Sequence, residues 1–139
     1  MKNNIFFFIL LLLVSNEKSF GQNTTASMEN GKSIYSTYCM SCHMEDGNGL
    51  EGVYPSLVKT AGLADKNRLA KIVLQGIRGP ITVKGVKYDA DMAGVALSDQ
   101  EVADVINYIR NSWGNKLPEV KASDVDAAKK AVVKGYQPY

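Results

Sequence analysis

Apolar residues along this chain fall in short stretches separated by polar and glycine-rich segments, and the first stretch stands apart. After a short positive start, every residue of the range 5–14 is apolar. Small residues at Ser19 and Gly21 then complete a pattern typical of a secretory signal peptide, cleaved before Gln22. The apolar run is short against the ~20 residues that cross a bilayer. We therefore expect residues 1–21 to be removed and the mature chain to lack an integral membrane segment.

Helical periodicity predicts four helices after this leader. Their apolar residues recur three or four positions apart, a spacing that brings them to one face of a helix. The predicted helices cover residues 28–38, 65–75, 98–114 and about 123–135. The second is bounded by a capping Asp65 and by Gly76. The third is the clearest, because Ser98 and Glu101 form a capping box ahead of a regular apolar face.

The segments between these helices are irregular. Residues 22–27 are polar, and we expect them to be mobile. Residues 77–96 alternate apolar and polar positions around a Lys-Gly pair, which predicts a small hairpin. Residues 115–122 form a linker to the last helix, which Ser123 or Asp124 is expected to cap. Its inward side is expected to comprise Val125, Ala128 and Val132. The pattern indicates a small all-α domain, and loops of this length suggest a large apolar ligand packed between them.

Charge and cysteine content narrow the function classes. The formal net charge is +2, and it falls to +1 if Lys2, Lys18 and Glu17 leave with the leader. A nearly neutral chain argues against nucleic-acid binding, which needs a concentrated basic face. Two cysteines in an exported protein would ordinarily form a disulfide. Here, however, they lie three positions apart, and the only histidine of the chain follows directly.

Cys39, Cys42 and His43 form the Cys-x-x-Cys-His pattern to which haem is covalently attached. Two thiols at this spacing reach the two vinyl groups on one edge of a porphyrin, and the adjacent imidazole is carried beneath the ring, where it binds iron. A redox-active dithiol would need a helix that opens at the first cysteine, whereas here a predicted helix closes there. A structural zinc site needs four ligands, and a plain disulfide needs no histidine. We therefore predict one haem c with its iron.

The second axial ligand of the iron has to come from elsewhere in the chain. Methionine is the usual partner of histidine in electron-carrying haem proteins of this type, and the chain holds five. Met1 leaves with the leader, and Met28 begins the helix that leads into the attachment motif. Met40 lies between the two cysteines and Met44 directly follows His43, so neither can reach the opposite face of the ring. Met92, in the irregular segment before the capped helix, remains as the predicted ligand.

The segment Gly76–Gly114, together with Cys39–His43, resembles bacterial class I cytochromes c. The resemblance implies the cytochrome c fold, with three to five helices around one covalently bound haem, for residues 28–114. Residues 115–139 then form a linker and a C-terminal helix packed on this domain. The family commonly has proline directly after the ligating methionine, whereas this chain has Met92-Ala93. Because alanine restricts the backbone less than proline does, we expect this loop to be freer.

The same resemblance implies two contacts. The region of Gly31 and Tyr35 is expected to cross the capped helix near Tyr108. The carbonyl of Pro55 is expected to bond the second ring nitrogen of His43, which would fix the orientation of the imidazole.

These features favour a one-electron carrier and no enzyme, located in the periplasm and exchanging electrons with redox proteins. Its donor would be a dehydrogenase or a reductase, and its acceptor an oxidase or a reductase. Two alternatives stay open. The chain could be the haem subunit of a larger dehydrogenase or oxidase complex, with the same chemistry and a permanent partner. It could also be a ligand-binding or peroxidatic haem protein, if the second axial position is weakly held.

Overall fold

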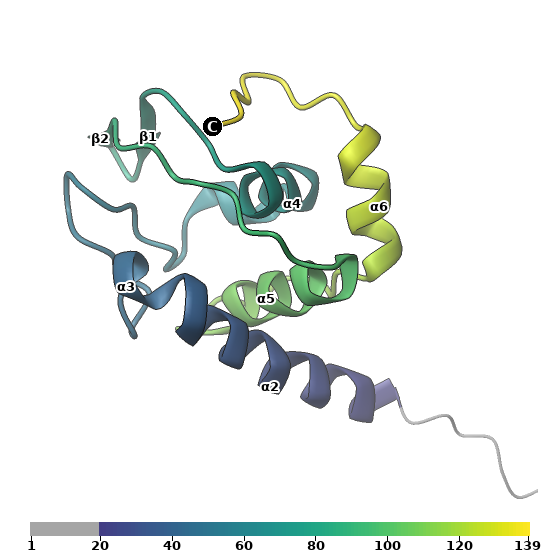
Figure 1. The fold of residues 1–139 in the computed structure, drawn as a ribbon. Helices are drawn as coiled ribbons and strands as arrows, with labels where there is room; N and C mark the ends of the chain where they lie inside the picture. Colours follow the sequence, from purple (N-terminus) through teal and green to yellow (C-terminus); the bar gives the residue numbers. More distant parts are fainter. Residues whose placement is uncertain (1–19) are drawn as a thin grey trace, which may run out of the picture.

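The computed structural model describes residues 20–139, so residues 1–19 of the predicted leader lie outside the described part of the chain. This part contains five α-helices (Figure 1), which are α2 (Phe20–Tyr38), α3 (Met40–His43), α4 (Lys66–Gln75), α5 (Asp99–Asn111) and α6 (Ala122–Lys130). A 3₁₀ turn, Ala61–Ala64, precedes α4, and a hairpin of β1 (Ile81–Val83) and β2 (Val86–Tyr88) follows it. The predicted all-α class is therefore confirmed, with the hairpin where the sequence predicted it. Within residues 20–139, no helix is long and apolar enough to span a membrane.

The helices α2 and α5 cross at a point of very close backbone approach (Figure 1). Gly31 of α2 lies against the carbonyl group of Asp104 on α5. A Cβ atom at Gly31 would lie 2.7 Å from the carbonyl carbon of Asp104 and 2.8 Å from the Cβ of Tyr108. Any larger side chain would hold the two helices apart, so the crossing requires glycine. The crossing near Tyr108 that the family resemblance implied is thereby confirmed.

The start of α2 differs from the prediction. We expected the helix to begin at Met28, whereas it begins at Phe20 and includes residues 22–27, whose expected mobility stays a prediction. Ser27 is buried, and its hydroxyl donates a hydrogen bond to the Asp104 carboxylate at 2.6 Å. This carboxylate therefore anchors a turn that the local sequence, being polar, does not mark as helical.

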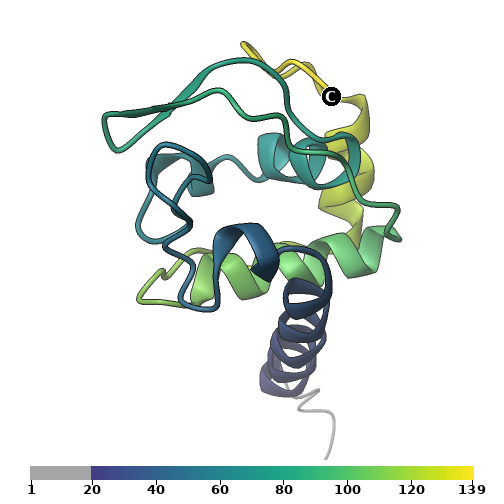
Figure 2. The ribbon, with the colours of Figure 1, turned by 60° about the vertical axis from the view of Figure 1, so that its left-hand side comes forward.

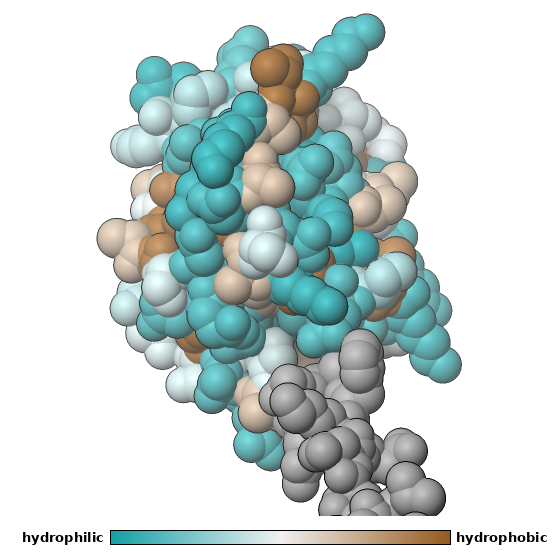
Figure 3. Space-filling view, turned by 90° about the vertical axis from the view of Figure 1, so that its right-hand side faces the viewer, coloured by the Kyte–Doolittle hydropathy of each residue, from teal (hydrophilic) through white to brown (hydrophobic). Residues whose placement is uncertain are grey.

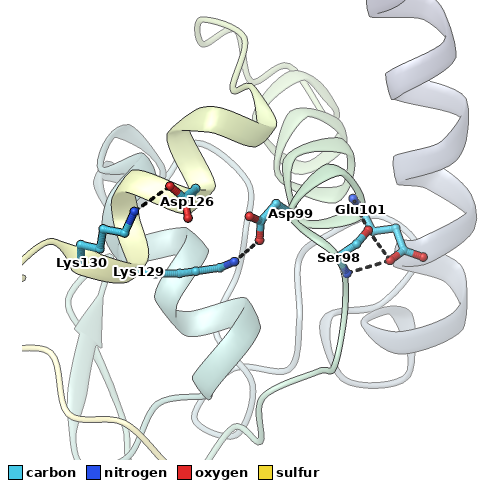
Figure 4. Close-up of polar contacts among 6 residues, drawn as sticks. All are labelled: Ser98, Asp99, Glu101, Asp126, Lys129 and Lys130. Carbon is cyan, nitrogen blue, oxygen red and sulfur yellow. Dashed lines mark hydrogen bonds and ion pairs between the residues drawn. The ribbon is translucent and has the colours of Figure 1, made fainter.

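The hydrophobic core is centred on α5. The capping box at its start is present, since the Ser98 hydroxyl accepts from the Glu101 amide and the Glu101 carboxylate accepts from the Ser98 amide (Figure 4). The predicted apolar face is buried and comprises Val102, Val105, Ile106 and Ile109. The helix ends at Asn111 rather than at Gly114, because the chain becomes extended at Ser112 and then turns through left-handed conformations at Trp113 and Gly114.

The helix α6 packs against α4 and α5, and it differs from the prediction at both ends. Lys121, not Ser123 or Asp124, occupies the N-cap position, and the Asp124 carboxylate accepts from the Lys121 amide at 3.0 Å. The helix stops at Lys130 because the chain becomes extended at Ala131. Val125 and Ala128 are buried as predicted, whereas Val132, beyond the helix, is 99% exposed.

The outer face of α6 is polar. Figure 3 shows mostly hydrophilic residues on this side of the molecule, with only scattered apolar ones. Lys130 pairs with Asp126 one turn earlier, and Lys129 forms an ion pair with Asp99 at the start of α5 (Figure 4). Such exposed pairs contribute little to stability, typically below about 1 kcal/mol each. This face therefore serves mainly as a solvated cover over α4 and α5.

The hairpin and the chain on either side of it lie apart from α3. In Figures 1 and 2 the hairpin lies at the top of the molecule and α3 lies lower. The two regions that carry the predicted iron ligands therefore come from different parts of the fold.

Candidate functional site

The attachment motif lies at the break between α2 and α3. The helix α2 ends at Tyr38, as predicted, and the short helix α3 starts directly after Cys39. The Cys39 carbonyl accepts hydrogen bonds from the amides of Cys42 and His43 at 3.2 and 2.9 Å, so one tight turn holds all three residues. Both cysteines are free thiols and partly exposed. Burial, followed by the neighbouring Cys42, raises the pKa of Cys39 to about 11.

The imidazole of His43 is oriented by the backbone. His43 is buried, and its Nδ1 lies 2.9 Å from the carbonyl oxygen of Pro55. A carbonyl oxygen can only accept, so Nδ1 carries the proton and Nε2 keeps a free lone pair. Burial lowers the pKa of His43 and so favours the neutral ring. The hydrogen bond to Pro55 has a smaller, opposing effect on this pKa. The contact that the family resemblance implied is thus confirmed, and it leaves Nε2 available to a metal.

The loop after α3 holds the Pro55 carbonyl in this position. The Gly49 amide donates to the His43 carbonyl at 3.0 Å, and the Leu57 amide donates to the Gly47 carbonyl at 2.7 Å. Gly49 has a left-handed backbone, with φ +65°, and a Cβ there would lie 2.8 Å from the Pro55 oxygen. Glycine is therefore required where the loop passes closest to the group that orients His43.

An aromatic cluster packs beside the turn that carries Cys39, Cys42 and His43. The rings of Tyr35, Tyr108 and Trp113 lie with their centroids 5.2 to 5.6 Å apart, each pair tilted or edge-on, an arrangement that aromatic rings favour. The Tyr35 hydroxyl donates to the Met44 carbonyl at 2.7 Å, and the Trp113 indole donates to the Glu45 carbonyl at 3.0 Å. The two residues that follow His43 are thus tied to α2 and to the end of α5. Nothing in the local sequence around Trp113 indicates this role, because the loop it contacts is far away in the chain.

Met92 lies in a backbone segment that is firmly paired with the end of α4. Ile77 and Met92 exchange two hydrogen bonds, of 2.8 and 3.0 Å, and the Val95 amide donates to the Val73 carbonyl at 2.8 Å. Two glycines permit this approach. A Cβ at Gly76 would clash with the Met92 carbonyl, and one at Gly94 would lie 2.7 Å from the carbonyl carbon of the last-but-one residue of α4. The backbone at Met92 is therefore held without a proline, although the expected extra freedom of the loop stays untested.

A separate groove lies away from these residues. It has a volume of about 520 Å³ and runs between the middle of α2, the start of α5 and the linker to α6. Asp104 lines it, and its carboxylate accepts hydrogen bonds from Ser27, Asn30 and Gln100. The groove includes none of the four predicted site residues.

The fold and the attachment turn together define a small helical haem protein of the covalently bound type. The family model named Cytochrome c matches residues 28–113, and the chain belongs to this family. Cytochrome c-552 of Thermus thermophilus is 35% identical over 115 residues, covering 78% of this chain and 76% of that protein. Cytochrome c-551 of Bacillus subtilis is 32% identical over 76 residues, covering 55% and 64%.

A second group of relatives consists of subunits of larger enzymes. The cytochrome c subunit of the quinone alcohol dehydrogenase of Gluconobacter oxydans is 36% identical over 126 residues, which cover 81% of this chain but 26% of that subunit. The predicted family is thereby confirmed, and with it haem c as the cofactor and electron transport as the general function. The residues of the attachment turn fit this cofactor, since two accessible thiols adjoin an imidazole whose second nitrogen is free.

Proposed function

We propose that this protein is a one-electron carrier in which Cys39 and Cys42 hold haem c and His43 and Met92 are the axial ligands of its iron. The bound haem supplies the one-electron chemistry, cycling between ferrous and ferric iron. The observation that carries the proposal is the 2.9 Å contact between Nδ1 of His43 and the Pro55 carbonyl, directly beside the two free thiols. It selects the tautomer that a metal-binding histidine needs.

The protein's own residues would set the properties of the iron. The hydrogen bond from His43 to Pro55 would raise the basicity of the imidazole and prevent its rotation. The thioether of Met92 would favour the reduced state and so raise the reduction potential. The two backbone bonds between Ile77 and Met92 would hold the backbone from which this side chain extends. With both axial positions filled by the chain, no substrate would reach the iron, which supports a carrier rather than an enzyme.

Replacement of the predicted ligand tests this assignment. We expect Met92→Ala, matured with its haem, to bind carbon monoxide rapidly in the reduced state and to have a lower reduction potential, because an axial position is opened. Met28→Ala is the matched control, since Met28 is a partly buried methionine on α2, and it should behave like the wild type. An optical spectrum of Met92→Ala identical to that of the wild type would show that another group is the ligand. Rapid carbon monoxide binding by the wild type would instead favour the ligand-binding or peroxidatic alternative.

We further propose that the protein is exported to the periplasm, where it exchanges electrons with redox proteins. The apolar run at residues 5–14 supports export. N-terminal sequencing of the mature protein should begin at Gln22, and a start at Met1 would contradict the predicted cleavage.

A second function is favoured by the relatives. Several of them are cytochrome c subunits of dehydrogenases, including that of a gluconate 2-dehydrogenase of Pantoea cypripedii, 39% identical over 108 residues. The chain covers only 24% of that subunit. Purification from native cells under mild conditions distinguishes the two functions. A free carrier should elute near the size of a single chain, whereas a fixed subunit should co-purify with dehydrogenase activity.

A further inference from the structure

The last nine residues of the chain return to the segment that carries the predicted second ligand. This C-terminal tail, residues 131–139, leaves α6 and passes over the end of α4 (Figure 1). The Tyr136 hydroxyl donates to the Gly76 carbonyl at 2.8 Å, with the Lys71 carbonyl as a second acceptor at 3.0 Å. The Arg78 amide donates to the carbonyl of Gln137 at 3.0 Å. The tail is therefore hydrogen-bonded to the chain on both sides of Ile77.

Ile77 in turn is the residue that pairs with Met92. The two backbone bonds between them, of 2.8 and 3.0 Å, face away from the tail, because successive residues of an extended segment direct their amide groups to opposite sides. The short segment 76–78 thus lies between the tail on one side and Met92 on the other. Any movement of Met92 away from the fold has to break its bonds to Ile77 or to carry this segment with it.

Side-chain contacts also connect the tail, segment 76–78 and the residues around Met92. A Cβ at Gly76 would lie 2.7 Å from the Cβ of Tyr139 and would also clash with the Met92 carbonyl, so both neighbours press directly on this glycine. The guanidinium of Arg78 lies over the Tyr139 ring, 5.2 Å from its centroid, and pairs with the Asp91 carboxylate at 3.7 Å. Asp91 directly precedes Met92.

We propose that the C-terminal tail is a positioning element for the axial ligand, which it acts on through segment 76–78. This inference rests on the proposed ligation by Met92. The tail lies beyond residues 28–113, the part of the chain that the family model matches. It supplies the restraint that Ala93 lacks compared with a proline at that position. Its contacts hold the backbone of Met92 and so limit how often the sulfur leaves the iron.

The test uses the full-length holoprotein with Tyr136→Phe, and in parallel a chain that ends at Gly135. Carbon monoxide binds only when the sixth position is free, so its binding rate to the reduced protein reports how often Met92 leaves. Loss of one hydrogen bond should raise this rate about fivefold in Tyr136→Phe. The shortened chain should show a larger increase and a lower reduction potential. Val132→Ala is the matched control within the tail, since Val132 is 99% exposed, and it should leave both quantities unchanged.

Two further variants make the outcome decisive. Val120→Ala, which truncates a buried residue of the linker before α6, lowers overall stability outside the tail and should leave the carbon monoxide rate near that of the wild type. If Met92→Ala opens the iron but Tyr136→Phe and the shortened chain bind carbon monoxide at the wild-type rate, the positioning role is wrong and the ligation stands. If Met92→Ala changes nothing, the ligation itself is wrong. An equal increase in Val120→Ala would mean that the tail contributes only to overall stability.

Discussion

Replacement of Gly31 by alanine probes the contact on which the fold depends most directly. The added Cβ would lie 2.7 Å from the carbonyl carbon of Asp104, whereas ordinary contacts begin at 3.4 Å. The two helices would have to separate by at least 0.7 Å, the difference between these distances. The obstructing atoms belong to the backbone of α5 and cannot rotate aside. The separation would also disturb the packing of the Tyr35 ring on Tyr108, now 5.3 Å between centroids.

The expected cost follows from two opposing contributions. Overpacking of a closely packed site costs about 1–3 kcal/mol, and the upper end applies because rigid backbone is displaced. Alanine gains roughly 1 kcal/mol over glycine inside a helix. We therefore expect Gly31→Ala to lower the free energy of unfolding by about 2 kcal/mol. This is a large effect for a residue that lacks a side chain.

Guanidinium titration of the holoprotein measures this quantity, followed by far-ultraviolet circular dichroism. Gly62→Ala is the matched control, because a Cβ at Gly62 meets nothing within 4 Å. It should change stability by no more than about 0.5 kcal/mol. If Gly31→Ala is as stable as Gly62→Ala, the two helices do not approach as closely as described and the reasoning fails. A change in the slope of the transition would mean that the unfolded or native state has changed in compactness.

Two further predictions concern polar groups. Asn115→Ala should lower the free energy of unfolding by roughly 3 kcal/mol in the same titration. The buried amide of Asn115 bonds three backbone groups, including the Leu57 carbonyl at 2.9 Å, and the substitution leaves these groups without partners. An effect below about 1 kcal/mol would contradict this. The pKa of Glu101 is lowered in the folded state by its bonds from Ser98, so the stability that this carboxylate contributes is present above about pH 4.5, the ordinary value for Glu, and is lost as the pH falls through the folded-state pKa. The stability difference between wild type and Ser98→Ala should therefore shrink below that pH, and a difference independent of pH would refute the assignment.

Features that depend on near neighbours in the chain were predictable. The capping box of Ser98 and Glu101, the helix from Asp65 to Gly76 and the turn at Lys84-Gly85 all depend on residues within a few positions of one another. The attachment motif belongs to the same kind, since its five residues are consecutive and their spacing is dictated by the edge of a porphyrin.

Errors occurred where a distant partner decides the local structure. The helix α2 extends to Phe20, and the buried Ser27 near its start bonds Asp104, which is 77 positions away. The helix α6 stops at Lys130, and beyond it the chain places Tyr136 on the end of α4. Neither partner carries a signal in the local pattern, so periodicity alone could not locate these boundaries.

The sequence by itself predicted which residues hold the haem and determined most of the segments that become helices, because covalent spacing and helix periodicity are local properties of the chain. Only the tertiary structure decided how these parts are held. It brought the Pro55 carbonyl to His43, paired Met92 with Ile77, and laid the C-terminal tail over segment 76–78. Each of these contacts joins groups that lie close together only when the whole chain is packed. Glycines make this packing possible, because they allow two backbone segments to approach closely.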